Sequence, residues 1–403
     1  MIKTTLTLLI FILVVGCNFT SSNEDPWKTE EIKQVSYPVD LTLIDSLSIP
    51  ISETIDPLQS SVKIFESNNT NYLYFLNRKT WKIELINIEP EKSSISIEIN
   101  KTGPNGVQNI KDIYINNLDS ILVIGGAGNM KVLTMLNKEG EVLKKWDLND
   151  ILDDKFESYW LTDFEMYPFT YDKMRKSVYF YLYEGPIVEK ETQSSIKQIA
   201  FNLENEEVTT FGHLPAEFND KSFYPYFGIA AGFTYDKVLN YFPSLRYIVS
   251  YNKDSLKNPK ILEFNSKHTQ GLNIAEDIIG FDPDSKSERK FLIENDSYFK
   301  MVNDPNSDLI FRFLKMGQPF LTLDGKQRDF LDIDFSVQIF NSDLELLKEV
   351  EFKNENDLLF PFSFAIGKKL YISNNNPMTK KFNEDQFKFK IYEVSFSDSN
   401  TIN

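Results

Sequence analysis

The sequence predicts an all-β protein built as a six-bladed β-propeller. Three observations indicate this fold: short strand-like runs follow one another from Val39 onward, turn signals separate them, and a unit of about 60 residues recurs. Seven blades or β-sandwiches are the alternatives. The propeller domain is expected to span residues 38–403, after a signal peptide at 1–16 and a short tether at 17–37.

The first element along the chain is an export signal. A basic start, Met-Ile-Lys, precedes an uncharged apolar stretch from Leu6 to Val15, and Gly16 follows directly. This pattern is typical of a cleaved secretory signal, and the stretch is too short to cross a bilayer comfortably. Residues 1–16 are therefore predicted to be a signal peptide.

Cys17, the only cysteine of the chain, is the predicted site of lipidation. Its place directly after Gly16 resembles the lipobox of bacterial lipoproteins, in which signal peptidase cuts before the cysteine and the thiol carries lipid. An ordinary signal peptide with a chance cysteine is the alternative. A net charge of −16 disfavours adsorption to anionic headgroups, so the lipid is expected to be the only membrane contact.

The segment after the cysteine is polar and acidic and contains Pro26, which indicates a flexible tether over residues 17–37. Within it, Ser21–Asp25 resembles the acidic export tags that send some Gram-negative lipoproteins to the cell surface. We therefore expect an outer-membrane lipoprotein of a Gram-negative bacterium. Whether it faces the periplasm or the surface is left open.

Strand patterns of two kinds follow the tether. Alternating runs such as Val39–Ile44 and Lys388–Val394 predict strands with one buried face, and continuous apolar runs such as Val178–Tyr183 predict strands buried on both faces. The clearest helical candidate is the short segment Leu148–Trp160. The run Val39–Ile44 is expected to pair with Phe387–Phe396 and close the ring, because an unpaired edge strand is a hazard.

An internal repeat supports the propeller over the sandwich. The segment Phe169–Lys173, Phe-Thr-Tyr-Asp-Lys, returns 64 residues later as Phe233–Lys237, and each copy leads into a strand. One four-stranded sheet cannot bury both of its faces alone, but sheets stacked in a ring cover one another. A looser unit with room for such a sheet starts near six positions: Tyr72, Ile121, Val178, Val238, Leu309 and Leu370.

A family resemblance agrees with this interpretation. The segment Lys101–Val107, followed by Ile113–Ile115 and Asp119–Ile121, resembles part of the six-bladed β-propeller lipoproteins, which are uncharacterised Gram-negative proteins classed as domains of unknown function. In that family a Gly-Pro-x-Gly turn leads into a strand that ends in Asp-Ser-Ile or Asp-Ser-Leu. The resemblance implies a fold and a location. It implies no reaction and no catalytic residue.

Composition limits the chemistry. An acidic chain is a poor partner for nucleic acid, and only two histidines, His213 and His268, are available for a catalytic base or an imidazole-rich metal site. Both lie in turn or loop contexts. The sequence therefore indicates no cofactor, no metal site and no catalytic residue.

Three loop motifs have structural interpretations that we prefer. Gly103–Gly106 is interpreted as a tight turn rather than a ligand-binding loop, because Pro pre-sets φ and Gly accepts a positive φ. Gly125–Asn129 is interpreted as a hairpin rather than a phosphate loop, because a strand and not a helix is expected to follow it. Asp282–Glu288 is interpreted as a solvated loop rather than a calcium site, since it lacks the glycine of such loops. The aromatic run Tyr224–Phe227 could stack on sugar rings but is more typical of a core.

The function that best fits is a lipid-anchored module that binds a ligand or a protein, with a protein or a glycan as the expected partner, through residues that the sequence does not identify. A carbohydrate-active enzyme with a carboxylate pair and a structural subunit of an outer-membrane assembly are the alternatives. Paired carboxylates around the central channel of the propeller would favour the enzyme. An aromatic or mixed surface at the opening of that channel would favour binding, and a large exposed apolar patch would favour assembly.

Overall fold

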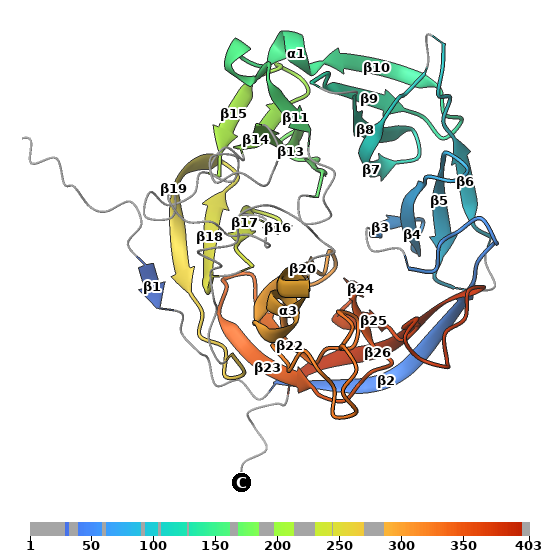
Figure 1. Cartoon of the computed structure of the whole chain (residues 1–403). Coiled ribbons are helices and arrows are strands. Elements are labelled where there is room, and N and C mark those ends of the chain that lie inside the picture. Colours follow the sequence, from blue (N-terminus) through green and yellow to red (C-terminus); the bar gives the residue numbers. More distant parts are fainter. Residues whose placement is uncertain are drawn as a thin grey trace, which may run out of the picture.

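Six antiparallel sheets surround a central axis in the computed structural model, which confirms the predicted six-bladed β-propeller (Figure 1). Within each sheet the strands are ordered from one that lies near the axis to one at the rim. The structure describes residues 29–31, 39–58, 62–89, 93–103, 106–126, 129–161, 168–184, 197–212, 230–243, 245–269 and 286–396.

Blades 1 to 3 follow one another in chain order, each as a meander of four strands with the innermost strand first. Blade 1 consists of β3 (Lys63–Ser67), β4 (Thr70–Asn77), β5 (Lys82–Asn87) and β6 (Ile95–Glu98). Blade 2 consists of β7 (Ile110–Asn117), β8 (Ser120–Gly125), β9 (Val132–Leu136) and β10 (Val142–Asp147). Blade 3 consists of β12 (Thr170–Asp172), β13 (Ser177–Glu184), β14 (Lys197–Asn202) and β15 (Val208–Phe211), with β11 (Tyr159–Leu161) also paired to β13.

Blades 4 to 6 complete the ring. Blade 4 consists of β16 (Ala230–Phe233), β17 (Lys237–Tyr241), β18 (Tyr247–Asn252) and β19 (Ser255–Glu263). Blade 5 consists of β20 (Ser297–Asn303), β21 (Ile310–Lys315), β22 (Phe335–Phe340) and β23 (Leu346–Phe352). Blade 6 consists of β24 (Leu359–Ile366), β25 (Lys369–Ser373), β26 (Gln386–Phe396) and β2 (Val39–Pro50).

The repeat predicted from the sequence corresponds to the blades. Its six expected starts fall in, or directly before, the second strand of each blade, from β4 in blade 1 to β25 in blade 6. The two Phe-Thr-Tyr-Asp-Lys segments occupy equivalent places, since each leads from the first to the second strand of its blade.

The ring closes by pairing strands from opposite ends of the described chain. β2 runs antiparallel to β26, from Val39 opposite Phe396 to Pro50 opposite Gln386 (Figure 1). The expected partner strands were therefore correct. Because the last blade takes its outer strand from the start of the domain, both ends are held by the same ladder, which leaves fewer free edges.

The hydrophobic core is divided among the blade interfaces. β21 shows how this works, because all six of its residues are buried. Phe311 and Phe313 pack in the cluster shared with blade 6, whereas Ile310 and Leu314 pack in the cluster shared with blade 4. Alternate residues of one strand therefore serve two interfaces, which explains the continuous apolar runs in the sequence.

One short strand comes from the segment expected to be the tether. β1 (Thr29–Glu31) pairs in parallel with β19 at the rim of blade 4, with Thr29 opposite Ile261. Residues 29–31 are thus held against the propeller. The signal peptide, Cys17 and most of the 17–37 tether lie outside the described residues.

The helical prediction for Leu148–Trp160 is only partly correct. The segment forms one turn of helix, α1 (Leu148–Ile151), then a 3-10 turn at Asp154–Phe156 and the start of β11. Leu152 and Asp153 are extended and interrupt the helix. Asn and Asp are frequent here, and their side chains favour caps and turns over helix interiors; the Asp147 carboxylate, for example, accepts from the Asn149 N–H.

A second helix was not anticipated. α3 (Lys286–Glu294) precedes blade 5 and begins inside the segment that was interpreted as a solvated loop. Residues 282–285 of that segment lie outside the described part of the chain.

Candidate functional site

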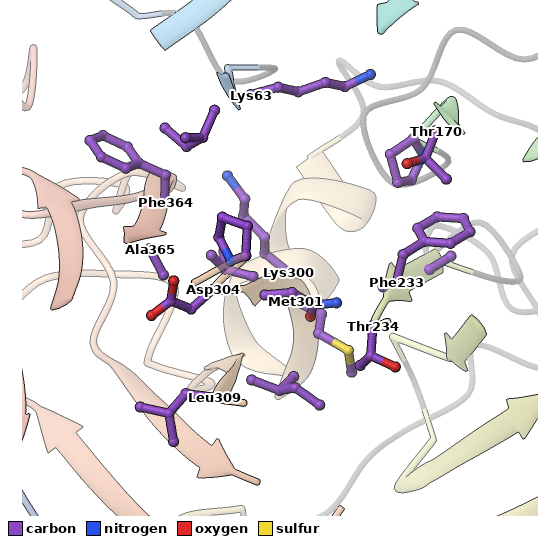
Figure 2. A pocket seen from close by; sticks show the side chains of 18 of the residues that line it. Lys63, Thr170, Phe233, Thr234, Lys300, Met301, Asp304, Leu309, Phe364 and Ala365 are labelled. Atoms are coloured by element: carbon purple, nitrogen blue, oxygen red, sulfur yellow. The ribbon is translucent and has the colours of Figure 1, made fainter. Parts of the chain in front are cut away.

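A cavity of about 830 Å³ occupies the centre of the propeller. Every blade contributes to its wall, mainly through its innermost strand. Figure 2 shows Lys63 of β3, Thr170 of β12, Phe233 of β16, Lys300 of β20 and Phe364 of β24 around the same space. The volume falls within the range of small-molecule sites.

On one side of the cavity a lysine ties three blades together. The Lys63 Nζ atom lies 2.8 and 2.7 Å from the two carboxylate oxygens of Asp112, on β7. The same ammonium donates to the backbone carbonyls of Ile113 and Phe169, at 2.8 and 2.9 Å. Burial lowers the pKa of Lys63, and the Asp112 carboxylate opposes that shift. All of the donors of this ammonium are engaged within the protein.

A second lysine, Lys300, connects blades 5 and 6 through hydrogen bonds. The Lys300 Nζ atom, on β20, donates to the carbonyl oxygens of Pro361 and Ser363, at 2.7 and 3.0 Å. Both acceptors belong to β24, the innermost strand of the next blade. Lys300 therefore fixes the spacing of two cavity walls.

A third cluster lies between blades 3 and 4. Lys253 donates to the Thr234 carbonyl at 2.6 Å and forms an ion pair of 3.2 Å with Asp172. Arg175 binds the same carboxylate at 2.9 Å and also reaches Asp254 at 2.7 Å. Burial acts to raise the pKa of Asp172, but the N–H of Arg175 and the charges of Lys253 and Arg175 together lower it. Asp172 is therefore a carboxylate held as an anion for structural purposes.

Asp304 is also fully occupied. It lies in the turn between β20 and β21. Its Oδ1 atom accepts from the N–H groups of Asn306 and Gly367 at 3.0 and 2.9 Å, and its Oδ2 atom accepts from Lys368 N at 2.6 Å and from the Ser307 hydroxyl. Asp304 links the blade 5 turn to the blade 6 turn.

Several aromatic side chains also line the cavity. Tyr114, Phe233 and Phe299 line the cavity and are partly exposed, and Tyr235 is 72% exposed. Phe233 and Tyr235 belong to the second copy of the repeated Phe-Thr-Tyr-Asp-Lys segment. The first copy contributes Phe169, Thr170 and Tyr171. The repeat was thus a sequence signal for two neighbouring parts of the cavity wall.

Two carboxylates of the cavity remain available. Asp236 accepts from the Thr234 hydroxyl at 3.2 Å and is 3.3 Å from the Lys237 ammonium, with 43% of its side chain exposed. Asp308 is exposed and forms no hydrogen bond or ion pair with the described part of the chain. The sequence analysis assigned no function to either residue, because aspartates in turns are common, although Asp236 lies in the repeated segment Phe233–Lys237.

The loop motifs singled out from the sequence take structural roles. Gly106 N donates to Gly103 O at 2.9 Å, as expected for a turn. Gly125 ends β8 and Gly126 begins the connection to the antiparallel strand β9, as the hairpin interpretation requires. His268 lies 3.3 Å from Glu351 near the rim. His213, Tyr224–Phe227 and residues 104–105 and 127–128 lie outside the described residues.

Neither a metal cluster nor a membrane-spanning helix is found where the structure describes the chain. No three His, Cys, Asp or Glu side chains there are grouped so as to hold a metal ion. None of the helices described has the length and apolar character needed to span a bilayer.

Fold and cavity together define a six-bladed β-propeller with a ligand-sized central cavity. The chain belongs to a family described as a domain of unknown function, DUF4221, which matches residues 38–351. This confirms the resemblance seen in the sequence. No curated protein matches the chain.

Two solved structures illustrate the similarity. A DUF4221 family member from Bacteroides vulgatus is 21% identical, with 91% of this chain and 100% of that chain covered and a TM-score of 0.71. A “Putative exported protein” from Bacteroides fragilis is 11% identical, with 92% and 99% covered and a TM-score of 0.48. At these identities the first similarity supports the fold alone.

Proposed function

We propose that this protein is an exported, lipid-anchored module that binds a small ligand in the central cavity of its propeller. The observation that carries the proposal is the cavity of about 830 Å³, whose wall joins aromatic side chains to a few polar groups. Pockets of that size and composition are typical of small-molecule sites.

Two of the wall carboxylates have structural roles rather than catalytic ones. Asp112 and Asp304, among the four carboxylates in the described part of the wall, are saturated by an ammonium or by N–H and hydroxyl donors. A glycosidase needs one carboxyl group to protonate the leaving group and a second to act as nucleophile or base. Groups bound so completely serve to hold the blades in place.

The anchor is the second part of the proposal. The apolar stretch before Gly16 and the position of Cys17 support export and lipidation. A lipid on Cys17 followed by the 17–37 tether would hold the propeller at the surface of a membrane, which we infer to be the outer membrane of a Gram-negative bacterium. No nucleic acid is expected as a partner, because the chain carries a net charge of −16.

A blocked-cavity variant tests the binding function. Thr170 lies in β12 and lines the cavity, so Thr170→Trp places an indole in the binding space (Figure 2). Thr210→Trp, in the outermost strand β15 of the same blade, is the matched control. Each purified protein is dialysed against a small-molecule extract of bacterial cells, and the retained compounds are identified by mass spectrometry.

We expect one or more compounds to be retained by the native protein and by Thr210→Trp, and lost from Thr170→Trp. Retention of nothing by the native protein, or of the same compounds by Thr170→Trp, would contradict the proposed function.

A further inference from the structure

The geometry points to an organic cation as the ligand of the central cavity: an ammonium group carried on an apolar, ring-sized body. This inference rests on the proposed function, because it names the ligand class of that same site.

The first argument is that the described part of the cavity wall offers no free cation to an anionic ligand. Three basic side chains are found there: Lys63, Lys253 and Lys300. Each of them donates to backbone carbonyls, and Lys63 and Lys253 also face a carboxylate. An anion would have to displace these contacts between blades. Binding an anion therefore costs stability of the ring.

The second argument is that the same cavity keeps negative charge available. Asp308 is exposed without a partner in the described part of the chain, and Asp236 is only partly compensated, by Lys237. They lie in the turns of adjacent blades, 5 and 4, that lead from the first to the second strand. A ligand ammonium near these turns would gain a carboxylate partner without breaking a contact. The net charge of −16 adds a long-range attraction for cations.

The third argument is the aromatic surface. Phe233, Tyr235 and Phe299 come from the same two blades, 4 and 5, as the two available carboxylates. Tyr235 is the most exposed of them, at 72%. Aromatic faces attract ammonium groups and also cover apolar bodies. A neutral sugar would use the rings but leave the carboxylates without a charged partner, whereas an organic cation uses both.

A matched set of probes tests the inference. Phenethylammonium, 2-phenylethanol and phenylacetate share one ring and one short chain and differ in charge. Their dissociation constants are measured by calorimetry and by ligand-observed NMR with the full-length protein purified in detergent. We expect the cation to bind about fivefold or more tightly than the alcohol, and the anion to bind least tightly.

Three variants assign the effect to residues. Asp308→Asn should remove most of the preference for the cation over the alcohol. Asp343→Asn, an exposed aspartate in the turn between β22 and β23 that is outside the cavity wall, should leave it unchanged. Tyr235→Leu should weaken binding of both the cation and the alcohol, whereas Tyr235→Phe should retain it.

Each other outcome overturns the inference. Tightest binding of phenylacetate, equal binding of cation and alcohol, no binding of any probe, or an Asp308→Asn variant that keeps the full preference would each show that the ligand class is wrong. The dialysis experiment remains separate. If Thr170→Trp abolishes retention of cell compounds while the probes show no preference for the cation, the cavity binds ligands and only the assigned class fails.

Discussion

Gln198 and Asn240 exchange two hydrogen bonds across the interface between blades 3 and 4. Gln198 Nε2 lies 2.6 Å from Asn240 Oδ1, and Asn240 Nδ2 lies 2.8 Å from Gln198 Oε1. Both side chains are 1% exposed, and Gln198 also donates to the Tyr181 hydroxyl at 2.7 Å. The two amides sit on the second strand of one blade and the third strand of its neighbour, so they fix how those blades meet.

This pair predicts a coupling between two substitutions. Asn240→Leu leaves a buried amide of Gln198 without its partner, and we expect it to lower the free energy of unfolding by about 1–3 kcal/mol. Gln198→Leu should cost a similar amount. The double variant should cost about 0.5–3 kcal/mol less than the sum of the two, because neither orphaned amide then remains. Urea unfolding of the four proteins measures the coupling. Strict additivity would contradict the prediction.

The blades could be predicted from the sequence because their signals are local. The apolar run Val178–Tyr183 lies in β13, the second strand of blade 3. The two copies of the Phe-Thr-Tyr-Asp-Lys segment occupy equivalent places in blades 3 and 4. The closing strand followed from a general rule, that edges need partners. Helix α3 was missed because its apolar side chains are few and its start overlaps an acidic, loop-like segment.

The cavity could be predicted only in part. The repeat marked two stretches of its wall, but nothing in the sequence joins Lys63 to Asp112, which lie 49 residues apart, or to the carbonyl of Phe169, which lies 106 residues away. Every residue has a backbone carbonyl, so the sequence does not show which carbonyls accept a hydrogen bond from a lysine. Asp308 stands out only because it lines the cavity without a partner in the described part of the chain. That property can be recognised only once the fold is known.

Alanine substitutions at two glycines with positive φ can distinguish the cost of backbone strain from the cost of a steric clash. Gly140 (φ +75°) follows β9, and a Cβ atom there would lie 2.0 Å from the Glu98 carbonyl oxygen of blade 1. Gly325 (φ +78°) has no atom within 4 Å of that position. Gly325→Ala should therefore cost about 1 kcal/mol from backbone strain alone.

Gly140→Ala should cost at least about 2 kcal/mol more, because the neighbouring blade must move as well. The midpoints of urea unfolding for the two variants provide the comparison. Equal losses would show that blade 2 does not approach blade 1 as closely as described.

A buried lysine makes stability depend on pH. Lys315 on β21 is fully buried, and its ammonium donates to the carbonyls of Leu292 and Asn295 at the end of α3. Burial lowers the pKa of Lys315 to about 7, from an ordinary value of 10.5, and Asp296 opposes the shift. Between these two values the unfolded chain binds a proton that the folded chain lacks. Stability from this group therefore rises with pH across that window.

We expect the free energy of unfolding of the native protein, measured relative to Lys315→Met, to increase between pH 7 and 10 by up to about 1.4 kcal/mol per pH unit. Groups common to both proteins cancel in the difference. Lys290→Met, on the exposed side of α3, is the control and should give a flat difference. A flat or falling difference for Lys315→Met would mean that this ammonium is not buried in the folded state.

The lipid anchor gives a prediction that depends on Cys17 alone. If the lipobox works as proposed, the protein produced in a Gram-negative host loses residues 1–16 and gains lipid on Cys17, so intact-mass spectrometry should show both changes together. The Cys17→Ser variant should carry no lipid. It should either be absent from the membrane fraction or keep its signal peptide uncleaved. The propeller begins only after this segment, so the circular dichroism spectrum of Cys17→Ser should match that of the native protein. An unmodified Cys17 in the native protein, or equal membrane association of both forms, would exclude the anchor and leave the binding function of the cavity to be judged on its own.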